Sequence, residues 1–189
     1  DHLKLFSGYK ANITGEIAVF EKMSSLTFVR LADTDVTGDI SVFSDKKALT
    51  NLYLNNTNVY GSIASFENCS RLRWLFLRNT DIDGDVQVFE NIEDMYMLDL
   101  YGTFVSGDTT VEDSFVDPYV IEFSNTLCDG VDYMIVYDGQ TEENKDRLSY
   151  ADTIYIKNVD DLSFLSSLKN LETIIATENV SGSLEDMNN

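Results

Sequence analysis

The chain has 189 residues, 43% of them hydrophobic, and a formal net charge of −20 from 33 acidic residues against 13 lysines and arginines. This length and apolar content are sufficient for one domain with a continuous core. The acidic field excludes nucleic acid and anionic membrane surfaces as partners, because both would repel it, and no apolar run approaches the roughly 18 residues that span a bilayer.

A 23-residue repeat organises most of the chain. Glycines recur at this period at positions 15, 38, 61, 84, 107 and 130, and threonines at positions 34, 57, 80, 103 and 126. Full units begin at Leu26, Leu49 and Leu72 and share the pattern LxxLxLxxTxVxGxIxxFxxxxx. An internal repeat of this length predicts a solenoid, in which each unit forms one coil.

Each unit begins with a predicted strand. In LxxLxL the alternating leucines, such as Leu52 and Leu54, point to the core, and the residues between them point outward. The repeat therefore predicts a parallel front sheet with strands at 28–32, 51–55, 74–78, 97–101 and 120–124.

The rest of each unit turns the chain off the strand and returns it along the back. We expect the threonine hydroxyl to satisfy backbone groups at the turn, and the glycine to supply a turn conformation that residues with a Cβ avoid. The apolar residues that follow the glycine are spaced three apart, as in Ile63 and Phe66, which is typical of short helical or 3₁₀ turns.

The repeat becomes irregular after position 130. A sixth unit starts at Pro118 and keeps the register up to that glycine. The segment VDYMIVYDG then predicts an extra strand, TEENKDRLSYAD a charged helix or loop, and the later TIYIKNVDDLSFLSSL a shorter leucine pattern. We predict one solenoid domain over 1–189, with regular units over about 1–130, an irregular insertion over 131–152, and shorter repeat-like or capping units over 153–189, in which Val180, Gly182 and Leu184 repeat the VxGxI step.

The segment LTNLYLNNTNV and its copies resemble the leucine-rich repeat family over nearly the whole chain. Threonine stands where the common LxxLxLxxN pattern has asparagine, the GxIP step of the plant type lacks its proline, and cysteine-bearing end caps are missing. The combination is more similar to leucine-rich repeat proteins of bacterial surfaces than to receptor ectodomains. The resemblance implies an α/β right-handed solenoid with a parallel front sheet and short helical or 3₁₀ turns on the back.

The two cysteines predict buried thiols that form no disulfide. Cys69 occupies a back position held elsewhere by Met23 and Ile92, and Cys128 occupies the valine position after the threonine. They lie three coils apart, on the order of 14 Å at the spacing of parallel strands, which exceeds the roughly 7 Å that a disulfide allows.

The sequence does not indicate catalysis or a metal. The single histidine, His2, stands at the N-terminal end, and no carboxylate pair is selected among the many acidic residues. Asp81, Asp83 and Asp85 lie in DIDGDV, but the glycine comes too early for a calcium loop. Asp85 recurs in register as Asp39 and Asp108, with Glu16, so we interpret these positions as a solvated acidic edge beside the turn. We expect no enzyme activity, no cofactor and no metal. The sequons at Asn12, Asn55, Asn68 and Asn179 are interpreted as accidental.

The segment RLRWLFLRN places aromatic and arginine side chains on the outward face of the front sheet. Stacked strands bring these side chains into adjacent rows, and Tyr9 extends the rows at the N-terminal end. The predicted ligand-binding residues are Phe28, Arg30, Tyr53, Trp74, Phe76, Arg78 and Tyr101. Such residues anchor interfaces, and the inner face of a solenoid is its usual binding surface. Cross-strand aromatic pairs also stabilise sheets without binding anything.

Three functions are compatible with this surface. The preferred hypothesis is a non-enzymatic module, extracellular or at a bacterial cell surface, that binds a protein ligand with a basic rim; any targeting segment lies outside this sequence. A carbohydrate-binding module would stack sugars on Trp74, Tyr53 and Phe76 and use an asparagine row of Asn51, Asn55, Asn56 and Asn79. A structural spacer of a larger surface protein would use the aromatics for packing alone.

Overall fold

The structure is a computed structural model that describes residues 2–124, 126–129, 134–138, 148–149, 151, 153–176 and 179–183. The chain divides into two compact units, 1–131 and 132–189. The division follows the last glycine of the regular 23-residue period in the sequence. That both units belong to one continuous solenoid domain stays a prediction.

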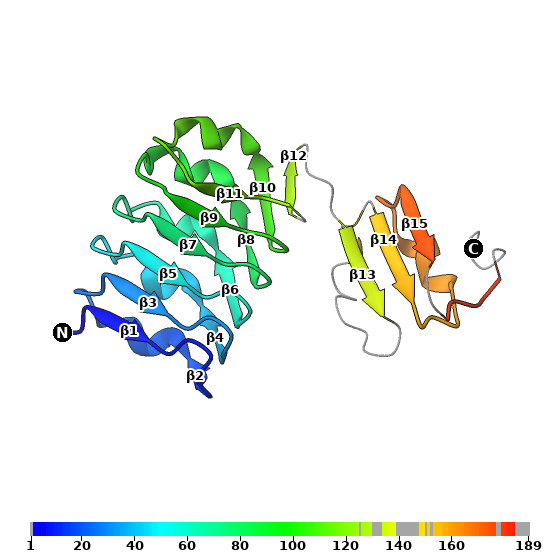
Figure 1. The fold of residues 1–189 in the computed structure, drawn as a ribbon, viewed down its shortest axis with the longest axis horizontal. Helices are drawn as coiled ribbons and strands as arrows, with labels where there is room; N and C mark the ends of the chain where they lie inside the picture. Colours follow the sequence, from blue (N-terminus) through cyan, green and yellow to red (C-terminus); the bar gives the residue numbers. More distant parts are fainter. Residues whose placement is uncertain are drawn as a thin grey trace. The chain divides into compact units, whose positions relative to one another are not determined.

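The first unit contains the predicted parallel front sheet, to which each coil contributes one strand (Figure 1). Its strands, in spatial order, are β1 (Leu5–Ser7), β3 (Phe28–Arg30), β5 (Asn51–Tyr53), β7 (Trp74–Phe76), β9 (Met97–Asp99) and β11 (Val120–Glu122). The register pairs residues 23 apart, so Leu52 lies opposite Leu75. The strands end two residues earlier than predicted, but backbone hydrogen bonds between coils continue, as from Leu31 N to Tyr53 O at 2.9 Å.

A second parallel sheet occupies the segment where the sequence predicted a turn. Its strands are β2 (Thr14–Glu16), β4 (Asp35–Asp39), β6 (Asn58–Ser62), β8 (Asp81–Asp85), β10 (Phe104–Asp108) and β12 (Leu127–Asp129). Gly38 has φ +122, as expected of a position that favours glycine, but the turn prediction was wrong, because this residue pairs with Val59 inside the ladder. Without a Cβ, the strand accepts positive φ while the next coil packs beside it.

Short 3₁₀ turns form the back of the first five coils, which confirms that part of the prediction. They are η1 (Ile17–Phe20), η2 (Ile40–Phe43), η3 (Ile63–Phe66), η4 (Val86–Asn91) and η5 (Thr109–Ser114). The aspartates interpreted as a solvated edge have a further role, since their carboxylates cap these turns. Asp39 Oδ1 accepts from Ser41 N at 2.8 Å, and Asp85 and Asp108 accept from the equivalent amides at 2.9 Å. The hydrogen bonds that Asp108 accepts from Thr110 lower the pKa of Asp108.

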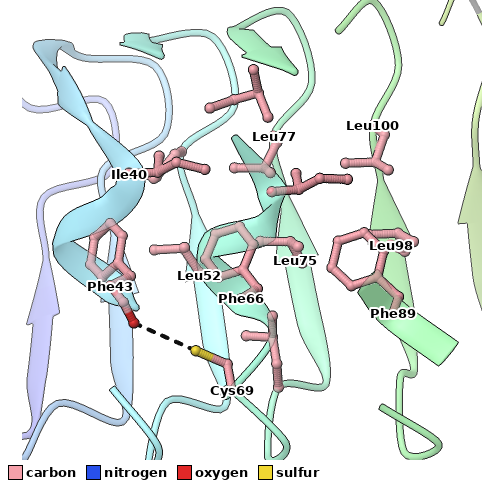
Figure 2. Close-up of a cluster of buried hydrophobic side chains, with 14 of the residues drawn as sticks. Ile40, Phe43, Leu52, Phe66, Cys69, Leu75, Leu77, Phe89, Leu98 and Leu100 are labelled. Atoms are coloured by element: carbon pink, nitrogen blue, oxygen red, sulfur yellow. Dashed lines mark hydrogen bonds between the residues drawn. The ribbon is translucent and has the colours of Figure 1, made fainter. Parts of the chain in front are cut away.

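The core lies between the front strands and the 3₁₀ turns (Figure 2). Leucines of the strands, such as Leu52 and Leu75, meet phenylalanines of the turns, such as Phe43 and Phe66, and all four are fully buried. Cys69 and Cys128 are buried, as predicted, and neither forms a disulfide. The core therefore repeats coil by coil, and the outward residues of the strands are not needed to fill it.

The repeated threonines are buried and satisfy the backbone where the front strands end, which confirms their predicted role. In each case the hydroxyl donates to the carbonyl oxygen three residues earlier, from Thr57 to Leu54 at 2.6 Å and from Thr103 to Leu100 at 2.8 Å. Side-chain hydrogen bonds of this kind replace a backbone partner that the turn cannot supply.

The described part of the second unit is a three-stranded parallel sheet of β13 (Met134–Asp138), β14 (Thr153–Lys157) and β15 (Thr173–Ala176), with the 3₁₀ turn η7 (Ser163–Ser167). The extra strand predicted in VDYMIVYDG is therefore present. Ile154, Ile156 and Leu165 are buried. Of the charged helix or loop predicted in TEENKDRLSYAD (141–152), only residues 148, 149 and 151 are described, and the predicted repeat position Leu184 lies outside the described residues. No helix in the described part of the chain is long and apolar enough to cross a membrane.

Candidate functional site

A row of three rings runs across the front sheet of the first unit. Phe28, Tyr53 and Phe76 project from β3, β5 and β7, because each alternates with a buried core residue of its strand. The ring centroids of Phe28 and Tyr53 are 5.6 Å apart, and those of Tyr53 and Phe76 are 4.9 Å apart in a stacked arrangement. We call these three residues the ring row. All three are half-buried, so they cover the sheet and also present apolar surface.

A second aromatic group adjoins the start of the same strands. The Trp74 ring lies 5.1 Å from that of Tyr96, which stacks on Tyr119 at 5.6 Å. Tyr119 is 69% exposed. Sequence analysis found Trp74 but missed both tyrosines, which stand one residue before β9 and β11. The 23-residue period could have identified Tyr96 and Tyr119, because they are 23 residues apart and in register with Arg73.

Arg30 projects from β3 and lies against aromatic rings. Its guanidinium carbon is 3.9 Å from the ring centroid of Tyr9 and 5.6 Å from that of Tyr53. A guanidinium over an aromatic face is attracted by the ring and is held in a fixed orientation. The structure therefore brings Arg30 together with the ring row, as the sequence predicted.

Arg78 and Tyr101 lie just beyond the ends of β7 and β9, not on the strands as predicted. Arg78 Nε donates to Asp99 Oδ2 at 2.8 Å, and its guanidinium carbon lies 4.5 Å from the Tyr101 ring centroid. Asp99, which the pattern pointed outward, is largely buried, and its other oxygen accepts from Tyr101 N at 3.2 Å. Arg78 is thus already neutralised within the protein.

The asparagine row is largely occupied by internal hydrogen bonds. Asn56 Nδ2 donates to Asp33 Oδ1 at 2.6 Å, and Asn79 Nδ2 donates to Asn56 Oδ1 at 2.9 Å. Asn51 Nδ2 contacts the Tyr53 hydroxyl at 3.3 Å. Three of the four amides that would bind sugar hydroxyls are therefore engaged in stabilising the coils, which weakens the basis of the carbohydrate hypothesis.

The described residues offer little for catalysis or metal binding. They contain no group of three or more histidine, cysteine or acidic residues placed to hold a metal ion. Two hollows, of about 260 Å³ beside Phe6 and Val19 and about 310 Å³ beside Asp39 and Lys46, lie away from the predicted site residues. The front surface is instead an open aromatic face. Its rings can make apolar contacts, and its arginine side chains can donate hydrogen bonds.

Comparison with known proteins identifies solved structures with the same architecture. No family model matches the sequence, and no curated protein matches it. The chain is similar to the LRR ectodomain of the plant membrane receptor kinase GASSHO1/SCHENGEN3 from Arabidopsis thaliana, solved in complex with CASPARIAN STRIP INTEGRITY FACTOR 2. The sequence identity is 17% and the TM-score is 0.61, and the match covers 96% of this chain and 24% of that one. It is also similar to the plant peptide hormone receptor RGFR1 in complex with RGF2, at 15% identity and a TM-score of 0.60 over 98% of this chain and 34% of that one.

A bacterial structure is similar as well. The internalin C2 of Listeria monocytogenes has 18% identity and a TM-score of 0.52, over 98% of this chain and 76% of that one. At these identities the similarity concerns the fold. This chain spans about a quarter to a third of the two plant receptors.

Proposed function

Because the chain has the leucine-rich repeat fold, we propose that it is a non-enzymatic recognition module that binds a protein ligand on the front surface of its first unit. The observation that carries the proposal is the ring row, in which Phe28, Tyr53 and Phe76 are held in mutual contact on three adjacent strands. Rigid aromatic side chains bind with a small loss of conformational entropy.

The proposed contact includes Trp74, Arg30, Arg78 and Tyr101 around the ring row. Tryptophan, tyrosine and arginine dominate the energetics of protein interfaces. Packing alone does not require these residues, since Leu52 and Leu75 already fill the core beneath them. The similar receptor structures, solved in complex with CASPARIAN STRIP INTEGRITY FACTOR 2 and with RGF2, support a protein ligand.

The location that we propose is outside the cell or at its surface. The similar solved structures include an ectodomain and an internalin, which supports this location. The acidic surroundings of the front surface favour a ligand whose rim is basic, because charge complementarity at an interface sets partner choice and association rate more than affinity.

The proposal is tested with an array of 12-residue peptides of varied sequence, with a glycan array as the comparison. We expect Tyr53→Ala and Trp74→Ala to weaken binding to selected peptides about tenfold or more, as loss of a central aromatic anchor does. Tyr60→Ala is the matched control, because Tyr60 is 49% exposed on β6 and lies away from the front sheet. Equal effects of Tyr53→Ala and Tyr60→Ala would contradict the proposed surface, and binding to glycans alone would favour the carbohydrate hypothesis.

The same variants separate binding from folding. Trp74 is half-buried on the surface of β7, whereas its neighbour Leu75 is fully buried in the core. We expect Leu75→Ala to lower the free energy of unfolding by roughly 2–5 kcal/mol, and Trp74→Ala to lower it by about 1 kcal/mol at most. Urea unfolding followed by circular dichroism measures both. If Trp74→Ala is as destabilising as Leu75→Ala, Trp74 belongs to the core and the spacer hypothesis gains.

A further inference from the structure

Arg30 and Arg78 of the front surface differ in their partners. Arg78 is paired with Asp99. Arg30 forms no ion pair with any acidic residue in the described part of the chain, and its Nε is buried with no hydrogen-bond partner there. A charged donor without an acceptor is costly, because it has lost water and gained no hydrogen bond. Arg30 is therefore a cationic group whose hydrogen bonding is incomplete.

The aromatic neighbours hold this cation without neutralising it. Tyr9 covers the guanidinium at 3.9 Å, and Tyr53 lies at 5.6 Å on the side of the ring row. The stacking fixes the plane of the guanidinium, and the side chain keeps part of its surface exposed. A planar, oriented guanidinium is suited to accept a carboxylate through paired N–H donors.

The charge of the surrounding strands favours an anion at this position. The outward residues of β1, β3, β5 and β7 include no aspartate or glutamate, although the protein carries a formal charge of −20. Asp99 and Glu122 appear on the front sheet only at β9 and β11. Asp33, which lies beyond the end of β3, accepts a hydrogen bond from Asn56. An anion at Arg30 thus meets no outward carboxylate on the four neighbouring front strands.

We propose that Arg30 is the subsite for an aspartate or glutamate side chain of the protein ligand, with an adjoining apolar residue of that ligand packed on Phe28 and Tyr53. This inference rests on the proposed function. Because Nε itself is buried, the carboxylate would accept from the terminal N–H groups of the Arg30 guanidinium, and the rings would exclude water from the pair. The subsite selects the ligand at one position, while the ring row supplies apolar contact area.

The experiment uses the whole 189-residue chain and an array of 12-residue peptide triplets whose members differ only by Glu, Gln or Lys at one position. The wild-type chain should bind the Glu member about tenfold more tightly than the Gln member, since a charged hydrogen-bonded pair contributes this much. Arg30→Gln should abolish that preference, and Arg30→Glu should transfer it to the Lys member. Arg71→Gln, which makes the same charge change at an exposed position preceding β7, should keep the preference for Glu.

The outcomes distinguish this inference from the proposed function. A preference for Glu that survives Arg30→Gln overturns the subsite, as does equal binding of Glu and Gln members by the wild-type chain. If in either case Tyr53→Ala still weakens peptide binding about tenfold or more, the front surface remains the binding surface and only the role of Arg30 is wrong. If the wild-type chain binds no peptide, or binds peptides equally well after Tyr53→Ala, both proposals are overturned. Thermal unfolding of each variant verifies that it is folded.

Discussion

Cys69 shows how burial controls the chemistry of one side chain. Its thiol donates to Phe43 O at 3.5 Å inside the core, and burial, with a smaller contribution from Asp45, raises its pKa to about 11 from an ordinary value of 9.0. Because the thiolate is the reactive form, Cys69 should react slowly with thiol reagents in the native state. Labelling in the presence and absence of denaturant checks this, and rapid labelling of Cys69 under native conditions at pH 8 would contradict it.

The same pKa shift predicts how stability depends on pH. A folded-state pKa above the unfolded value means that the protonated thiol stabilises the folded state below pH 9, and that this contribution is lost as pH rises towards about 11. The free energy of unfolding of the wild type should therefore fall by about 2–3 kcal/mol more than that of Cys69→Ala between pH 8 and 11. The tyrosines titrate in both proteins, so their contribution cancels when the two pH profiles are compared. Parallel pH profiles would show that Cys69 does not titrate as inferred.

Lys46 occupies a core position that apolar residues hold in neighbouring coils. It stands 23 residues from Met23 and from Cys69, it is 3% exposed, and its Nζ donates to Glu21 O at 2.6 Å. A buried ammonium has a desolvation cost that one hydrogen bond offsets only in part. We expect Lys46→Met to leave stability unchanged or to raise it by up to about 2 kcal/mol in urea unfolding.

The control for this prediction is Lys47→Met, at an exposed position next in the sequence, which should change stability by about 0.5 kcal/mol or less. A loss of more than about 1 kcal/mol in Lys46→Met alone would show that the contact with Glu21 O is worth more than the apolar side chain.

At the scale of elements, the glycines of the second sheet allow a matched comparison. Gly84 and Gly15 have similar backbone conformations, with φ +109 and +106. A Cβ at Gly84 would lie 2.5 Å from Ser62 Oγ and 3.3 Å from Ile63 N of the preceding coil, whereas a Cβ at Gly15 would meet nothing within 4 Å. Both alanine substitutions should cost about 1–3 kcal/mol through backbone strain, and Gly84→Ala should cost more because of crowding. If urea unfolding shows that both variants lose the same free energy of unfolding, backbone strain alone accounts for the loss and crowding does not contribute.

The sequence predicted those elements whose residues alternate or recur with a clear period. Leucines at alternate positions identified the front strands, and apolar residues three apart identified the 3₁₀ turns. The second sheet was missed because its strands contain residues that are depleted in strands, such as Gly38 and Asp39, and because its hydrogen bonds depend on neighbouring coils. The capping role of Asp85 was also missed, although its hydrogen bond from Gln87 N is local in sequence.

The candidate site was predictable to a similar degree. Alternation placed Trp74 and Phe76 outward, but it could not show that Asp99 neutralises Arg78 while Arg30 lacks such a partner. That difference depends on side-chain conformations across coils that are 21 residues or more apart. Tyr96 was missed because only strand residues were considered, although the loop residue before each strand also lies beside the front surface.

At the scale of the whole molecule, the principal hydrophobic cluster lies within the first unit. The principal cluster of buried residues extends from Ile17 to Cys128 and contains no described residue of the second unit. A compact unit with its own core is expected to fold independently of its neighbour. Trp74 is the only tryptophan of the chain, so its fluorescence reports on the unfolding of the first unit alone.

We therefore predict that a chain ending at residue 131 unfolds, by Trp74 fluorescence, within about 3 °C of the full chain, which corresponds to a stability difference of about 1 kcal/mol or less. A single continuous solenoid over 1–189 predicts a different result, because repeats in a solenoid stabilise their neighbours, and removal of residues 132–189 would expose the last coil of the first unit. A fall in Tm of more than about 5 °C would support the continuous solenoid. Leu75→Ala in both chains is the internal control, since a core defect in the first unit should lower the Trp74 transition by the same amount in each.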